Sequence, residues 1–404
     1  MARTLHLTVA LLIVAALMPA AALAGGPAAT RAVLASQMRQ AGSGSGAFAM
    51  DLDSGRTIFA SRADTARTPA SVEKLYTTST ALTLYGVEGH LTTRVLGDVG
   101  VDPAGVLIGN LYLRGGGDPN FGEREAAVLA DQLVLDDGLR EITGRVMGDE
   151  SAFDTLRGPP SEGYRTTNEV GPLSALTFNR GRTGARRPYW QKRPPLYAAR
   201  AFERALKRRD VVIGGAARTG RTQQAALPLA EQRSATMAEI ARLTNRPSDN
   251  FNAETLIKAL GEEFGAGGTT RAGAAVVRRT MTGFGLRPRV ADGSGLSRSN
   301  RTTPRQVVRL LQQMAEDEAG PAFQTSLAVA GRSGTLENRM RRSVARDRCQ
   351  AKTGTLNYVS ALAGYCQTMS GARVAFAYLM TGVNVYGAHR LQDRMTAALA
   401  RYSP

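Results

Sequence analysis

Three short motifs carry the residue types that nucleophilic catalysis needs. In chain order they are S-V-E-K at 71–74, S-D-N at 248–250 and K-T-G at 352–354. Residues three apart share one face of a helix, so Lys74 can reach the hydroxyl of Ser71 and remove its proton. A single S-x-x-K or S-x-N pattern is weak evidence. All three motifs in this order, however, favour one shared active site.

Each motif also has an explanation that involves no chemistry. Ser71 could cap a helix while Lys74 points to solvent, and the polar residues at 248–250 suit a helix-capping turn. Lys352 could be an ordinary strand residue before a bulge. The joint occurrence of the three motifs makes these structural explanations the weaker ones.

The chain's use of lysine supports the chemical interpretation. Only five of its 51 basic residues are lysines, and Lys74 and Lys352 are two of these. Arginine stays protonated at physiological pH, whereas a buried lysine can lose its proton and act as a base. We expect Ser71 at the positive end of a helix, with Lys352 as the cation that lowers the pKa of Lys74 further.

The composition excludes several other functions. With three histidines and two cysteines the chain has little material for a Ser-His-Asp triad or a zinc site, and we expect no metal and no cofactor. The formal net charge of +17 would suit nucleic acid, but no nucleic-acid-binding motif accompanies it, so no nucleic-acid partner is expected. Hydrophobic and charged fractions of 43% and 21% are those of an ordinary globular protein.

The first residues have the pattern of an export signal. Arg3 precedes an apolar run from Leu7, which ends in the small-residue sequence Ala22-Leu23-Ala24. This pattern predicts a cleaved secretory signal, not a membrane anchor. We therefore expect an exported protein, located in a periplasm or in the cell wall and extracellular space.

Strand signals lie at both ends of the remaining chain. Residues 46–60 have the pattern of a hairpin, and three strand-like runs occupy 347–382. Helical patterns lie between them at 234–245 and 251–265, and a closing helix is expected from about His389. Two early and three late strands predict one sheet closed over a long sequence distance.

The middle of the chain has a different character, with short strand-like pieces between glycine, proline and aspartate turns. Its basic run around Tyr189 and Trp190 suits either a plain solvated surface or a contact with anionic wall polymer. The expected division is a signal at 1–24, a core in two segments at 25–94 and 231–404, and an inserted β-rich domain at 95–230.

The two cysteines, Cys349 and Cys366, lie symmetrically about Asn357 and Tyr358. A hairpin with its turn there would bring them opposite each other. In an exported chain both a cross-strand disulfide and a pair of free buried thiols are consistent with this spacing.

The motifs and several longer stretches resemble those of the serine penicillin-recognising enzymes. The stretches are "GNLYLRGGGDPNF", "GPLSALTFN", "LTNRPSDNFNAETLIKALG", "DGSGLSRSNRTTP", "GRSGTLENRM" and "AKTGTLNYVSALAGY". The chain is most similar to the class C low-molecular-mass penicillin-binding proteins, which are D-alanyl-D-alanine carboxypeptidases and endopeptidases. The resemblance implies an α+β fold: a β-lactamase/transpeptidase-like core with a five-stranded antiparallel sheet flanked by helices, and an inserted β-rich domain.

The resemblance also implies roles for the catalytic residues. Ser71 would attack the carbonyl between two D-alanines of a peptidoglycan stem peptide, with Lys74 as general base. Ser248 would relay a proton to the leaving amine, and Asn250 would hold the donor carbonyl. Lys352 would contribute positive potential, and β-lactam antibiotics would be inhibitors.

A second set of residues would bind the substrate. Thr353 and Thr355 hydroxyls would bind the terminal carboxylate beside Gly354, and the N–H groups of Ser71 and Thr355 would form the oxyanion hole. Arg298 could contact the stem peptide or form a structural salt bridge. Some members of the family use an acidic residue to bind the amine end of diaminopimelate; here Asp154, Glu162 and Glu169 all lie in the inserted region, and the sequence does not choose among them.

Two other functions use the same features. A β-lactamase or esterase could employ the same serine and lysine, although no acidic motif for rapid deacylation is found at the expected place. A catalytically inactive wall-binding scaffold could instead depend on the basic insertion. The intact motifs favour the carboxypeptidase or endopeptidase. The identity of the third stem-peptide residue and the oligomeric state stay open.

Overall fold

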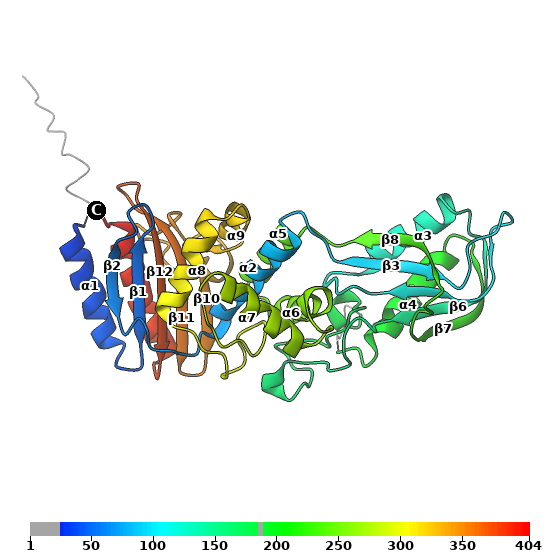
Figure 1. Cartoon of the computed structure of the whole chain (residues 1–404), viewed down its shortest axis with the longest axis horizontal. Coiled ribbons are helices and arrows are strands. Elements are labelled where there is room, and N and C mark those ends of the chain that lie inside the picture. Colours follow the sequence, from blue (N-terminus) through cyan, green and yellow to red (C-terminus); the bar gives the residue numbers. More distant parts are fainter. Residues whose placement is uncertain (1–24, 185–188) are drawn as a thin grey trace, which may run out of the picture.

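Two separate β-sheets occupy the two ends of an elongated molecule, with helices between them (Figure 1). The computed structural model describes residues 25–184 and 189–404, so the predicted export signal at 1–24 lies outside the described residues. The first sheet takes its strands from both ends of the chain, and the second takes its strands from the middle. Within the described residues, no helix is both long enough and apolar enough to cross a membrane.

The first sheet is antiparallel and has the order β2-β1-β12-β11-β10-β9. Its strands are β1 (Gly46–Asp51), β2 (Thr57–Ser61), β9 (Ala328–Val329), β10 (Cys349–Leu356), β11 (Val359–Gln367) and β12 (Arg373–Thr381). The five predicted strands are present, and the α+β prediction is confirmed. The sixth, β9, was not predicted because two residues are too short to show strand periodicity.

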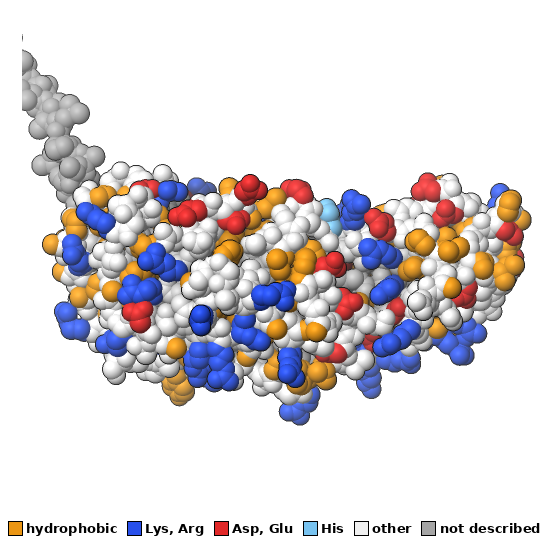
Figure 2. Space-filling view, viewed as in Figure 1, with side chains coloured by type: hydrophobic (Ala, Val, Ile, Leu, Met, Phe, Trp, Pro, Cys, Tyr) orange, Lys and Arg blue, Asp and Glu red, His pale blue; other side chains and the backbone are white. Residues whose placement is uncertain are grey.

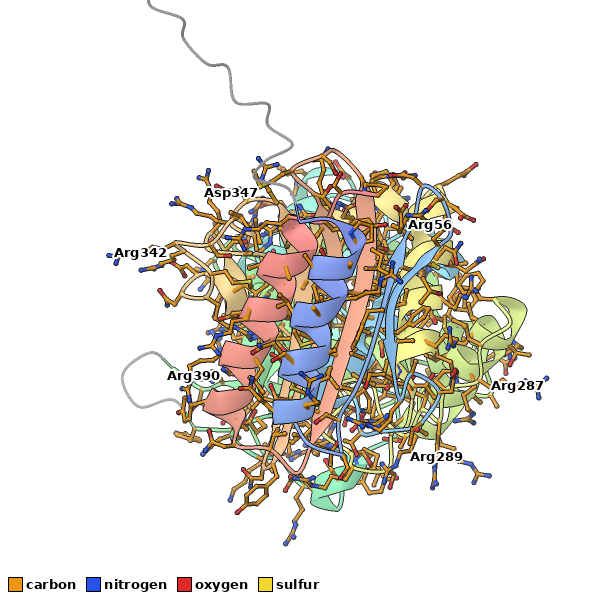
Figure 3. All side chains as sticks on the ribbon, turned by 90° about the vertical axis from the view of Figure 1, so that its left-hand side faces the viewer. Arg56, Arg287, Arg289, Arg342, Asp347 and Arg390 are labelled. Carbon is orange, nitrogen blue, oxygen red and sulfur yellow. A yellow bond between two sulfur atoms is a disulfide. The ribbon has the colours of Figure 1, made fainter. Side chains whose placement is uncertain are left out.

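Both faces of this sheet are covered, which explains why β12 is a nearly continuous apolar run without alternation. On one face α1 (Pro27–Gln40) and α10 (Val385–Ala400) lie side by side (Figure 3). On the other lie α2 (Lys74–Tyr85) and α8 (Pro304–Glu316). Helix α10 begins before the expected His389, because the side chain of Asn384 accepts the N–H of Gly387 and caps the helix there.

The helices α5 (Met237–Asn245), α6 (Asn250–Phe264) and α7 (Thr270–Gly283) lie between the two sheets (Figure 1). They share one hydrophobic core with α2 and the first sheet. A short helix, α9 (Gly320–Thr325), completes the described helices of this half. The residues just before α2 pack against β10 and β11, and α6 packs against α2, so the segments that carry the motifs adjoin one another.

The second sheet has the order β4-β6-β5-β3-β8, with β7 also paired to β6. Its strands are β3 (Thr92–Gly97), β4 (Val106–Leu107), β5 (Leu111–Arg114), β6 (Glu141–Asp149), β7 (Val212–Thr219) and β8 (Leu227–Arg233). Two helices, α3 (Glu123–Leu135) and α4 (Pro194–Lys207), pack on it around a hydrophobic core separate from the first. The sheet begins and ends just outside the range 95–230.

The two cysteines are opposite each other in the register of β10 and β11 and are joined by a disulfide. Of the two arrangements that the sequence left open, the structure has the cross-strand bond. It ties together the strand that carries Lys352 and its neighbour β11.

Replacing both Cys349 and Cys366 with alanine should lower the free energy of unfolding by about 3 kcal/mol, because the bond closes a short loop in the unfolded chain. Urea unfolding with and without reductant measures this change. Reductant should destabilise the wild type and leave the double variant unaffected. Equal midpoints for the oxidised wild type and the double variant would contradict a stabilising role.

Candidate active site

Ser71 and Lys74 lie on consecutive helical segments. A 3₁₀ turn, η2 (Ala70–Glu73), contains Ser71, and α2 begins at Lys74. The sequence suggested one helix; the 3₁₀ turn differs in having three residues per turn, which places i and i+3 on one side. The Nζ of buried Lys74 donates to the Oγ of half-buried Ser71 at 3.0 Å.

Two oxygens complete the surroundings of the Lys74 amine. Its Nζ donates to Oδ1 of Asn250 at 2.7 Å and to the backbone carbonyl of Ser294 at 2.6 Å. Asn250 is the first residue of α6, so the S-D-N motif meets the Ser71 turn through this lysine. Ser294 was not predicted as a site residue, because the sequence gives no signal for the position of a backbone carbonyl.

The third motif lies along β10. The Nζ of buried Lys352 donates to Oγ of Ser248 at 2.7 Å and to the carbonyl of Thr353 at 2.8 Å. The structure thus brings the three motifs together, with one lysine beside Ser71 and the other beside Ser248.

Close backbone packing holds β10 against the Ser71 turn. A Cβ atom on Gly354 would lie 2.7 Å from the carbonyl of Pro69 and 3.0 Å from the N of Ser71, so only glycine fits there. Ala70 and Ser248 both have left-handed backbones, with φ of 47° and 64°. Such conformations cost about 1–3 kcal/mol each and are typical of functional sites.

Burial changes the proton affinity of both lysines. It lowers the pKa of Lys74 to about 8, against the opposing effect of the Asp292, Glu254, Asp249 and Glu169 carboxylates. Burial, and then the charge of Lys74, lowers the pKa of Lys352 well below its usual range. A neutral lysine is therefore available near neutral pH, as a general base requires.

Three buried carboxyl groups lie behind Lys74, and the sequence did not identify them as part of the site. Glu254 accepts the N–H groups of Gly293 and Ser294, and Asp292 accepts hydrogen bonds from its own loop. Glu73 is fully buried, and neither of its carboxyl oxygens has a hydrogen-bond partner among the described residues. Burial, followed by the charge of Asp292, raises the pKa of Glu73 well above its usual range. Burial thus favours the neutral form of Glu73 in the folded protein.

The residues expected to bind substrate lie along β10 and its turn. Thr353 Oγ1 donates to Thr335 Oγ1 at 2.8 Å, which adds an unpredicted hydroxyl, while Thr355 is exposed farther along the strand. Exposed Arg298 donates to the carbonyl of Asn357 at 2.6 Å, so its guanidinium is held at the β10–β11 turn by a backbone oxygen.

The three acidic residues singled out in the middle of the chain have separate positions. Asp154 forms an ion pair with Lys258 at 2.6 Å, and Glu162 is exposed in a short 3₁₀ turn. Glu169 accepts a hydrogen bond from Nδ2 of Asn250 at 3.0 Å. Of these three, Glu169 is the one placed beside the motifs.

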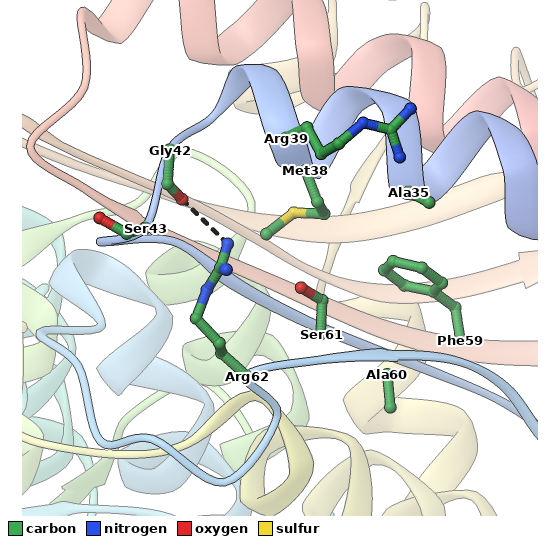
Figure 4. Close-up of a pocket in the computed structure, with 9 residues that line it drawn as sticks. All are labelled: Ala35, Met38, Arg39, Gly42, Ser43, Phe59, Ala60, Ser61 and Arg62. Carbon is green, nitrogen blue, oxygen red and sulfur yellow. Dashed lines mark hydrogen bonds between the residues drawn. The ribbon is translucent and has the colours of Figure 1, made fainter.

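Of two pockets in the structure, one adjoins the motifs and the other does not. One of about 160 Å³ is lined by Glu169, Arg180, Trp190 and Asn250, among others, and adjoins the motifs. Another of about 450 Å³ lies between α1 and the edge strand β2, where Arg62 donates to the carbonyl of Gly42 (Figure 4). No motif residue lines this second pocket, so it is not part of the candidate active site.

Glu73→Gln tests the buried neutral carboxyl. Its folded-state pKa is raised above the unfolded value of about 4.5, so wild-type stability is lost as pH rises above that value, whereas an amide cannot ionise. The unfolding free energy of the variant relative to wild type should therefore increase as the pH rises above about 5, by up to about 1.4 kcal/mol per pH unit. Urea unfolding at several pH values measures this, with Glu162→Gln as the exposed control. A pH-independent difference would show that Glu73 is ionised when folded.

Comparison with known proteins gives matches that cover most of the chain. The model of the D-Ala-D-Ala carboxypeptidase 3 (S13) family matches residues 29–187 and 184–402. The D-alanyl-D-alanine carboxypeptidase of Actinomadura sp. (strain R39) is 28% identical, with 90% of this chain and 82% of that protein covered. Carboxypeptidase DacB of Mycolicibacterium smegmatis is 29% identical, with 86% and 78% covered.

Solved structures show the same fold. Penicillin binding protein 4 from Haemophilus influenzae has a TM-score of 0.77 at 20% identity, over 90% of this chain and 97% of that one. A predatory peptidoglycan endopeptidase from Bdellovibrio bacteriovorus has a TM-score of 0.52 at 16% identity, over 84% and 86%. Since a single family model spans nearly all the described residues, the chain belongs to the D-Ala-D-Ala carboxypeptidase 3 (S13) family, and the predicted low-molecular-mass class C penicillin-binding protein is confirmed.

Proposed function

We propose that this enzyme cleaves the D-alanyl-D-alanine end of peptidoglycan stem peptides through an acyl-enzyme on Ser71. The observation that carries this mechanism is the 3.0 Å contact between Lys74 Nζ and Ser71 Oγ. Neutral Lys74 takes the hydroxyl proton as Oγ attacks the peptide carbonyl, and a tetrahedral intermediate forms. The C–N bond then breaks, D-alanine leaves as the amine, and water hydrolyses the ester.

The second serine and lysine serve the leaving group. The hydrogen bond from Lys352 to Ser248 supports a path by which a proton reaches the departing nitrogen. Backbone N–H groups of Ser71 and Thr355 would stabilise the oxyanion, and the hydroxyls of Thr353 and Thr355 would bind the substrate's terminal carboxylate. We assign Arg298, exposed at the adjacent turn, to the stem peptide.

A β-lactamase is the second candidate, and one observation favours it. Glu169 places an exposed carboxylate beside Asn250, where it could activate a deacylating water. Such an enzyme would turn penicillin over, whereas a carboxypeptidase of the proposed kind would retain it as a stable acyl-enzyme. The fate of bound penicillin therefore separates the two.

We further infer a core made of 25–94 and 231–404 and an inserted domain at 95–230. The two sheets with separate hydrophobic cores support this division. Activity on the cell wall, together with the signal-like residues 1–24, supports export. Both carboxypeptidase and endopeptidase cleavage fit the geometry, because the nucleophile is the same for each.

We also infer that the basic surface of the insertion contacts anionic wall polymer. Lys and Arg side chains follow the edge of the molecule over β7 and α4 (Figure 2). The exposed basic residues of α4, of β7 and of the positions that flank α4 are Lys192, Arg193, Arg200, Arg204, Lys207, Arg208 and Arg218. Such a surface attracts a polyanion at low ionic strength and releases it as salt is added.

A fluorescent penicillin should label the protein stably, as seen on a denaturing gel. Ser71→Ala should abolish labelling, because no nucleophile remains, and Lys74→Ala should slow it about 10²–10⁴-fold. Ser343→Ala, a serine outside the motifs, is the matched control. Rapid release of hydrolysed penicillin would favour the β-lactamase, and equal labelling of the Ser71 variant would reject this site.

The labelling rate should rise with pH through an apparent pKa of about 8, because only neutral Lys74 accepts the serine proton. Lys74→Arg keeps the charge but cannot lose its proton, so it should label as slowly as Lys74→Ala. Exposed Lys207→Arg should behave as wild type. A flat profile between pH 6 and 9 would exclude Lys74 as the titrating base.

A further inference from the structure

The amide side chain of Asn250 is hydrogen-bonded to an amine on one side and to a carboxylate on the other. Its Oδ1 accepts a hydrogen bond from Lys74 at 2.7 Å, and its Nδ2 donates to Oε2 of Glu169 at 3.0 Å. Lys74 is buried in the core, whereas Glu169 is exposed on the inserted segment. A carboxylate from the insertion is therefore linked through one amide to the lysine beside the nucleophile.

A carboxylate only accepts hydrogen bonds, so it discriminates between the two orientations of an amide. In the observed orientation the NH₂ group faces Glu169 and the oxygen faces Lys74. The flipped orientation would place two oxygens against each other at Glu169. Glu169 thus favours the orientation that presents an acceptor to Lys74.

That orientation decides what the lone pair of neutral Lys74 can do. A neutral amine has two N–H donors, and the Asn250 side-chain oxygen and the Ser294 carbonyl can accept both. The lone pair is then left for the hydroxyl proton of Ser71. A flipped amide would instead donate an N–H to that lone pair and compete with the serine.

We propose that Glu169 is a positioning residue for acylation: it holds the Asn250 amide so that the lone pair of neutral Lys74 faces Ser71. This inference rests on the proposed function, because it assumes that Lys74 is the base. The inserted segment then contributes to the chemical step itself.

An arginine that lines the same pocket as Glu169 is hydrogen-bonded to other residues. The guanidinium of Arg180, which lines the same pocket, is hydrogen-bonded to Asp249 at 2.5 Å and to Asn252 at 2.7 Å. The charged groups that act on Lys74 are the carboxylates of Asp292, Glu254, Asp249 and Glu169. The charge of Lys74 acts in turn on Lys352 and Glu73. Glu169 is the exposed member of this set, so replacing it disturbs the fold least.

The test measures acylation by a fluorescent penicillin that has no free amine, as a function of pH. Glu169→Gln keeps the shape but loses both the charge and the acceptor-only character. Its plateau rate should fall about tenfold, the effect of replacing a charged hydrogen-bond acceptor with a neutral one. The rise of its acylation rate with pH, which follows the loss of the Lys74 proton, should move to lower pH, because a negative charge near Lys74 is removed. Glu169→Asp should restore part of the plateau rate and leave the pH at which the rate rises unchanged. Glu162→Gln should match wild type.

A double-variant measurement shows whether the effect passes through Asn250. Asn250→Ala should lower the plateau on its own, and adding Glu169→Gln should then lower it no further. Equal effects of Glu169→Gln with and without Asn250 would overturn the proposal, because Glu169 would then act directly.

Other results would also overturn it and would identify a different role. Unchanged acylation with slower release of penicillin would make Glu169 the base for deacylation. Unchanged acylation by penicillin with a raised KM for a stem peptide would make it a substrate contact. If wild type shows no Ser71-dependent labelling at all, the proposed function itself fails, which is a distinct outcome.

Discussion

The burial of Lys74 is the constraint on which the rest of the site depends. A lysine that is taken out of water gives up its proton more readily, but its N–H groups must then find partners inside the protein. Ser71, Asn250 and Ser294 supply the oxygens, and they come from three distant parts of the chain. The fold can therefore be understood as the arrangement that brings these three segments around one amine.

The same constraint explains the glycine and the strained backbones nearby. Strand β10 must approach the Ser71 turn so closely that Gly354 has no room for a side chain. Ala70 and Ser248 adopt left-handed backbones at the same junction. The well-packed sheet and helices around them supply the stability that offsets such local costs.

Sequence patterns predicted the parts of this structure that have periodicity or distinctive chemistry. The five long strands, the α+β class and the three motifs were all recognisable, and scarce lysine marked two positions at the centre of the site. The Ser294 carbonyl could not be recognised from the sequence, because the position of a backbone group leaves no pattern of side chains. The raised pKa of Glu73 depends on its burial and on the charges of Asp292 and Glu254, which lie far away in sequence. Glu169 lies in an irregular loop, where the spacing of residues does not predict the direction in which a side chain points.

The pairing of β1 with β12 has a consequence for biosynthesis. Residues 46–51 find their central neighbour only in residues 373–381, so the sheet cannot close while the chain is incomplete. Contacts over such distances form slowly compared with local ones. K-T-G precedes β12 along the chain, so a growing polypeptide holds all three motifs before it can complete the sheet that supports them. The strand that carries Lys352 therefore becomes part of a complete sheet only after β12 has been synthesised.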